Sequence, residues 1–97
     1  MRESKLQTQC IGYLRAKGIP FVRIEKASDT GAPDLIVFCK YKTVCFELKK
    51  SAKAKRSKKQ IEFGNSINEH CLTALHWFLW NYEIFCALIY ASEWTTK

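Results

Sequence analysis

An amphipathic pattern opens the chain between Ser4 and Lys17. Its apolar positions are Leu6, Cys10, Ile11, Tyr13 and Leu14. Spacings of three and four residues predict a helix with one buried face, and Ser4 would cap its start. Gly18 tolerates the left-handed conformation with which many helices end, and Pro20 cannot continue a helix.

Shorter runs of β-branched and aromatic residues follow, and they predict strands. Phe21–Glu25 alternates apolar and polar side chains, whereas Lys26–Pro33 is rich in turn residues and predicts a loop. Asp34–Lys40 and Thr43–Lys49 are two further apolar runs with only a short turn between them. We therefore expect these two runs to form an antiparallel hairpin.

A long apolar pattern after Ser57 predicts a helix or a pair of helices, with Ser57 as N-cap and a bend at Gly64. Its apolar positions are Ile61, Phe63, Ile67, Cys71, Leu72, Leu75, Trp77, Phe78, Leu79 and Trp80. Leu72–Trp80 is apolar on more than one face, which predicts deep burial or a subunit interface. Glu83–Tyr90 predicts a last strand, and Ser92–Lys97 a short tail.

This order of elements predicts an α/β fold, in which helices flank a mixed β-sheet. The 97 residues show no internal repeat and no flexible linker, so we expect one domain over residues 1–97.

The net charge of +7 and the pI near 9.3 predict a polyanionic partner. Nucleic acid is the first candidate, and an anionic membrane surface is the second. The polar first residues lack the apolar core of a signal peptide, and no run reaches the roughly 18 apolar residues of a membrane span. The expected location is therefore the cytoplasm, with no membrane as partner.

Cysteine spacing argues against a disulfide framework and a zinc ribbon, because the five cysteines contain no C-x-x-C pair. Inside apolar runs a thiol acts as a small buried hydrophobe. His70, Cys71 and His76 match no common zinc spacing. The cysteines are Cys10, Cys39, Cys45, Cys71 and Cys86.

Two carboxylates meet on the predicted hairpin, where Asp34 opens the first strand and Glu47 lies near the end of the second. Such a pair is costly unless a cation neutralises it, and oxygen ligands of this kind suit Mg²⁺ or Mn²⁺. Lys49 shares a sheet face with Glu47 and could stabilise charge on a phosphate oxygen. The backbone carbonyl of Leu48 could complete the ion's ligands.

Each piece also has an ordinary structural explanation. E-x-K is common on solvated strands, and P-D is frequent at turns. A basic run is often a solvated surface, yet beside a metal site phosphate contact is the stronger hypothesis. Trp77, Phe78 and Trp80 are better explained as core or interface residues than as a platform for base stacking. The basic residues are Lys50, Lys53, Lys55, Arg56, Lys58 and Lys59.

The ordered combination GAPDLIVF…CFELKK resembles the PD-(D/E)xK nuclease superfamily, and in particular its virus-type replication-repair nuclease (VRR-NUC) domain in the phage-type stand-alone form. The resemblance implies a restriction-endonuclease-like core with Asp34 and Glu47 as metal ligands and Lys49 as the catalytic lysine. It assigns Glu3 a supporting acidic role at the metal, in part through water. Gln60 would position the water or the phosphate.

The same resemblance implies an Mg²⁺- or Mn²⁺-dependent endonuclease for branched DNA, such as a Holliday junction or a flap, that leaves 5′-phosphate and 3′-hydroxyl ends. It further implies a homodimer in a phage-infected or bacterial cytoplasm and a role in DNA repair, and Leu72–Trp80 is the candidate interface. Three alternatives stay open: a sequence-specific restriction-type endonuclease, a non-catalytic nucleic-acid-binding module, and a protein that binds an acidic partner.

Overall fold

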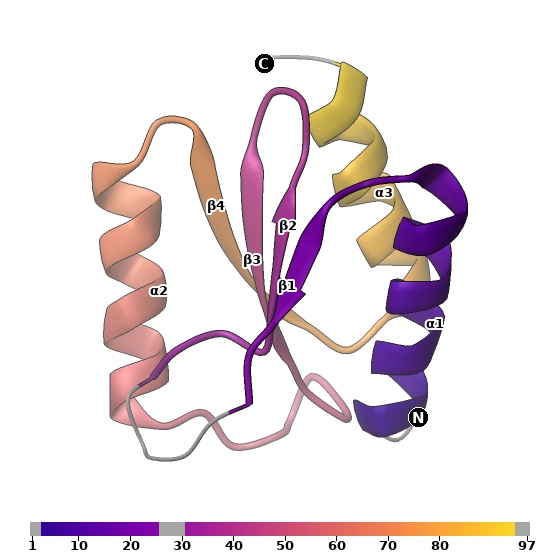
Figure 1. Cartoon of the computed structure of the whole chain (residues 1–97). Coiled ribbons are helices and arrows are strands. Elements are labelled where there is room, and N and C mark those ends of the chain that lie inside the picture. Colours follow the sequence, from indigo (N-terminus) through magenta and orange to yellow (C-terminus); the bar gives the residue numbers. More distant parts are fainter. Residues whose placement is uncertain (1–2, 26–30, 95–97) are drawn as a thin grey trace.

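The computed structural model describes residues 3–25 and 31–94, except the side chains of Glu3 and Ser4, so the predicted Ser4 cap lies outside it. Three helices and four strands follow one another along the chain (Figure 1). They are α1 (Glu3–Lys17), β1 (Phe21–Arg23), β2 (Leu35–Phe38), β3 (Thr43–Leu48), α2 (Lys58–His70), β4 (Ala74–Leu79) and α3 (Tyr82–Trp94). None of the helices in these ranges is long and apolar enough to cross a bilayer.

The four strands form one mixed sheet in the order β1-β2-β3-β4. The pairs β1–β2 and β2–β3 are antiparallel, whereas β4 pairs with β3 in parallel. Figure 1 shows α1 and α3 on one side of the sheet and α2 on the other. The predicted α/β fold with a mixed, helix-flanked sheet is therefore confirmed.

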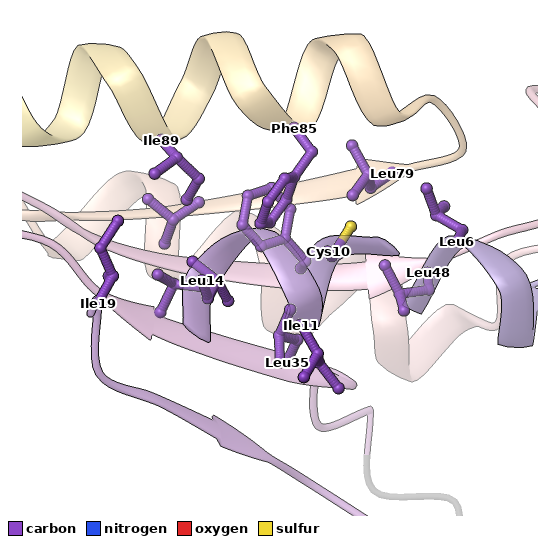
Figure 2. Packing of buried hydrophobic residues seen from close by; sticks show 13 residues of the cluster. Leu6, Cys10, Ile11, Leu14, Ile19, Leu35, Leu48, Leu79, Phe85 and Ile89 are labelled. Carbon is purple, nitrogen blue, oxygen red and sulfur yellow. The ribbon is translucent and has the colours of Figure 1, made fainter. Parts of the chain in front are cut away.

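The hydrophobic core lies between the sheet and the pair α1 and α3 (Figure 2). Alternate residues of β3 (Val44, Phe46 and Leu48) point into this core and are almost completely buried. The Phe46 ring lies 5.1 Å from that of Phe85 on α3. Burial of these apolar side chains fixes which face of β3 turns away from the core, and Glu47 is on that other face.

The N-terminal half matches its prediction closely. α1 ends at Lys17, and Gly18 follows with a φ of 69°, in the left-handed region. β2 and β3 form the predicted hairpin, with Leu35 opposite Phe46. The predicted strand at Phe21–Glu25 is present but shorter, and the described part of the predicted loop, residues 31–33, has no regular structure.

The predicted helical segment Leu72–Trp80 is wrong, because it contains strand β4. α2 ends at His70, and Cys71 caps it in an extended conformation. Helices cover both faces of β4, so its sequence lacks the polar–apolar alternation of a half-buried strand. Packing within one chain thus accounts for most apolar side chains of this segment, whereas Leu72 and Trp77 are exposed.

Gly64 does not bend the helix: α2 continues through it and packs closely on β4. A Cβ atom at this position would lie 2.6 Å from Nδ1 of His76. Asn68 of the same helix also bonds the backbone of His76, accepting its N–H at 2.8 Å and donating to its carbonyl at 3.3 Å. These contacts hold α2 against the outer strand of the sheet.

The predicted last strand, Glu83–Tyr90, is also wrong, because these residues belong to α3, and so do the first residues of the predicted tail. Phe85, Ile89 and Ser92 are its buried positions, at spacings of four and three residues. Asn81 provided a signal for the start of a helix, since its Oδ1 accepts the Ile84 N–H at 3.1 Å.

All five cysteines are free thiols, as expected. Cys10 and Cys45 are buried, whereas Cys71 is exposed and so departs from the prediction of buried thiols. Burial raises the pKa of Cys10 to about 12 and that of Cys39 to about 11. These two groups are therefore neutral thiols at physiological pH.

Candidate active site

Asp34 lies at the end of the sheet where β2 begins and β3 ends. Its N–H donates to the Phe46 carbonyl at 2.9 Å, and its own carbonyl accepts the Ile24 N–H at 2.9 Å. Its carboxylate Oδ2 accepts the Leu48 N–H at 2.8 Å. Asp34 is thus bonded to the residues on both sides of Glu47, which sets its backbone opposite Glu47, and the approach of the two carboxylates stays a prediction.

The Glu47 side chain is only 1% exposed, on the face of the sheet that α2 covers. Phe78 is its register partner on β4. A buried carboxylate is costly unless hydrogen-bond donors or a cation compensate for its lost hydration. An E-x-K motif without a function would have its glutamate on a solvated strand face. The burial of Glu47 is different from that arrangement.

The backbone at Leu48 is directed toward Asp34. In a strand, the N–H and the carbonyl of one residue point to the same neighbour. The Leu48 N–H bonds Asp34, whereas the Lys49 N–H points the other way, to the Leu79 carbonyl at 2.7 Å. The Leu48 carbonyl therefore points to the Asp34 side of β3, where the sequence hypothesis needs a third oxygen ligand.

Two acceptors hold the ammonium group of Lys49, whose side chain is 8% exposed. Nζ donates to Oε1 of Gln60 at 3.0 Å and to the Lys55 carbonyl at 3.0 Å. The lysine is thus fixed on the side of β3 that carries Glu47. Sequence reasoning identified Lys49 and Gln60, but no pattern signalled the Lys55 carbonyl.

The first turn of α2 is a capping box, and the predicted Ser57 cap is confirmed. Oγ of Ser57 accepts the Gln60 N–H at 3.1 Å, and Oε1 of Gln60 accepts the Ser57 N–H at 3.0 Å. That same Oε1 atom accepts the Lys49 ammonium. One carboxamide oxygen therefore fixes both the start of the helix and the direction of the lysine.

Gly31 connects the segment before Asp34 to α2. Its φ is +79°, and a Cβ atom there would lie 2.5 Å from the Lys59 carbonyl oxygen and 3.2 Å from the Gln60 nitrogen. Only glycine combines this left-handed conformation with so close an approach to the helix backbone. The segment 31–34, the end of β3 and the start of α2 thus meet at one place.

The remaining acidic candidate, Glu3, has a side chain outside the described residues. Its helix α1 begins at the same end of the molecule as α2 (Figure 1). Within the ranges 3–25 and 31–94, no group of three or more His, Cys, Asp or Glu side chains could hold a metal ion. The described oxygen donors are accordingly the carboxylates of Asp34 and Glu47 and the Leu48 carbonyl.

The basic segment, residues 50–59, runs from the end of β3 into the first turn of α2 and contains two kinds of residue. Its five lysines are exposed, whereas Arg56 is half-buried. The guanidinium carbon of Arg56 lies 4.5 Å from the ring centroid of Phe78 and 5.8 Å from that of Trp80. Sequence reasoning grouped Arg56 with the lysines, and the misassignment of β4 concealed this contact. The lysines are Lys50, Lys53, Lys55, Lys58 and Lys59.

Replacing Gly31 with alanine is expected to destabilise the protein by about 1–3 kcal/mol, because the added Cβ meets backbone atoms and φ is left-handed. Gly12→Ala is the matched control: it lies inside α1 with nothing within 4 Å of its Cβ position, and we expect stabilisation of about 0.5–1 kcal/mol. Urea unfolding measures both. Equal stabilities of Gly31→Ala and wild type would contradict this account of Gly31.

Comparison with known proteins yields no matching family model and no matching curated protein. A solved structure described as a VRR_NUC domain matches 91% of this chain and 94% of its own, with a TM-score of 0.73 and 20% sequence identity. The fold implied by the motif resemblance is thus confirmed. The chain has the fold of a VRR_NUC domain.

Proposed function

We propose that this chain is a metal-dependent endonuclease that hydrolyses DNA phosphodiester bonds. The observation that carries the proposal is the arrangement of Asp34, Glu47 and Lys49 at one end of the sheet, with Lys49 held by Gln60. The description of the structural neighbour as a VRR_NUC domain supports the same activity class.

The oxygen donors of Asp34, Glu47 and Leu48 fit a hard divalent cation such as Mg²⁺ or Mn²⁺. The Leu48 N–H orients the Asp34 carboxylate, and the same residue directs its carbonyl to that side of the strand. When bound, such an ion would lower the pKa of a water molecule and offset charge on the phosphate. Glu3 would support this site in our proposal, in part through water.

Lys49 would stabilise the negative charge that develops on the phosphate. A lysine ammonium has three N–H donors, and Gln60 and the Lys55 carbonyl take two of them. The third can donate to a phosphate oxygen or to the attacking water. Because the two fixed acceptors hold the ammonium before DNA binds, little reorganisation is needed during the reaction.

In the proposed reaction, water attacks phosphorus and the bond from phosphorus to the 3′ oxygen breaks. The water's proton passes to solvent and the departing oxygen gains one, which leaves 5′-phosphate and 3′-hydroxyl ends. The exposed lysines of the basic segment would bind flanking phosphates. A preference for branched DNA, such as a Holliday junction or a flap, is supported by the family resemblance.

The cleavage assay uses a labelled four-way junction, a flap and a plain duplex, with Mg²⁺, Mn²⁺ or EDTA. We expect cutting of branched DNA with either metal, and a loss of at least about 100-fold in Asp34→Asn and Lys49→Ala. The first variant loses a charged metal ligand, and the second loses the cation that faces the phosphate. Lys42→Ala is the control, since Lys42 lies in the hairpin turn at the opposite end of β3.

Full activity in Asp34→Asn and Lys49→Ala would contradict the proposed site. Tight binding without cutting under any metal would favour the non-catalytic module. Cuts at fixed sequences in many linear duplexes would favour a restriction-type enzyme.

Phosphate binding by the lysines is tested through its salt dependence, measured by fluorescence anisotropy in EDTA. Lys50→Ala and Lys53→Ala should each weaken binding for all sequences and reduce the slope of log K against log salt by about one. Lys42→Ala, at the far end of the sheet, should keep the wild-type slope. Unchanged slopes in the first two variants would exclude these lysines from the DNA-binding surface.

A homodimer is the last part of the proposal, because a two-fold axis would present two sites to the two strands of a branched DNA. Leu72 and Trp77, in the segment suggested as interface, are 95% and 38% exposed. Sedimentation velocity at micromolar concentration should give twice the 11.3 kDa of one chain. A clean monomer would remove the dimer but not the nuclease activity.

A further inference from the structure

An aromatic pocket of about 220 Å³ opens on β4 beside the candidate active site. Its walls are Arg56, His76, Trp77, Phe78 and Trp80. Arg56 comes from the basic segment and the other four come from β4 and the residue after it. No part of the proposed hydrolysis uses this pocket.

The pocket lies one strand away from the carboxylates. Glu47 on β3 pairs with Phe78 on β4, and neighbouring strands are about 4.8 Å apart. Paired residues of parallel strands share a sheet face, so Phe78 and Glu47 point to the same side.

The chemistry of the pocket suits a nucleobase. The Arg56 guanidinium is planar and already stacks on Phe78, at 4.5 Å from its centroid, and guanidinium and indole planes both stack on bases. Trp80, two residues after Phe78, is only partly buried and lies 5.8 Å from the same guanidinium carbon, so it adds a second aromatic ring on this face. Exposed lysines on the same segment as Arg56 supply the charge that attracts the backbone of a DNA strand.

We propose that this pocket, the stacking pocket, binds an unpaired base of the DNA strand next to the scissile phosphate. The proposal rests on the proposed function, which sets the path of the strand past Asp34 and Glu47. A base within a duplex is paired and stacked and would have to be extruded, whereas an unpaired base enters at lower cost. The stacking pocket thereby supplies a physical cause for a preference for branched or single-stranded DNA.

The test compares two probes of equal length and charge, oligothymidine and an abasic sugar-phosphate strand, by fluorescence anisotropy in EDTA. Wild type should bind oligothymidine at least about fivefold more tightly, because each stacked base adds affinity. Trp80→Ala should lose most of this preference while keeping its affinity for the abasic strand, and Trp80→Phe should restore it. Trp94→Ala, on exposed α3 surface, is the matched control and should keep the preference.

Equal affinity of wild type for the two probes would overturn the proposal without any variant. An equal loss of affinity for both probes in Trp80→Ala would also overturn the proposal. That result would mean that the aromatic residues only hold the basic segment in place and do not stack on a base. DNA cleavage without a base preference would leave the nuclease proposal standing by itself. A base preference without cleavage would remove the nuclease and retain the stacking pocket.

Discussion

The carboxamide oxygen of Gln60 is the acceptor on which the geometry of the candidate site depends. It takes the Ser57 N–H, which starts α2, and the Lys49 ammonium, which projects from the end of β3. Helix capping and lysine orientation therefore cannot be varied independently. Gly31 adds the third segment, because its backbone rests on the same helical turn. The site is in this sense a junction of three chain segments rather than a feature of one of them.

Sequence patterns predicted the parts of the fold that depend on neighbours close in the chain. α1 has a clear apolar stripe, and its end is marked by Gly18; the hairpin joins strands with almost no residues between them. The same hairpin brings Asp34 and Glu47 together, so the centre of the candidate site was also accessible from sequence. The Ser57 cap was predicted because a serine directly before a helical pattern is a local signal, and the structure shows that Gln60 completes a capping box there.

The failures concern the segments whose structure is decided by distant partners. β4 pairs with β3 in parallel across the whole of α2, and both of its faces are covered, so no alternation marks it. α3 is apolar around most of its circumference, which obscured its helical period, and the Asn81 cap was overlooked. The contact of Arg56 with Phe78 depends on β4, so no analysis of the basic segment alone could have found it.

The five exposed lysines of the basic segment have a consequence for the energetics of the free protein. Like charges gathered on one short segment repel one another, and the chain as a whole carries +7. This repulsion opposes the compact state and is screened by salt or by any bound polyanion. A nucleic acid bound to this segment would thus raise the free energy of unfolding, since it reduces the charge repulsion in the folded protein.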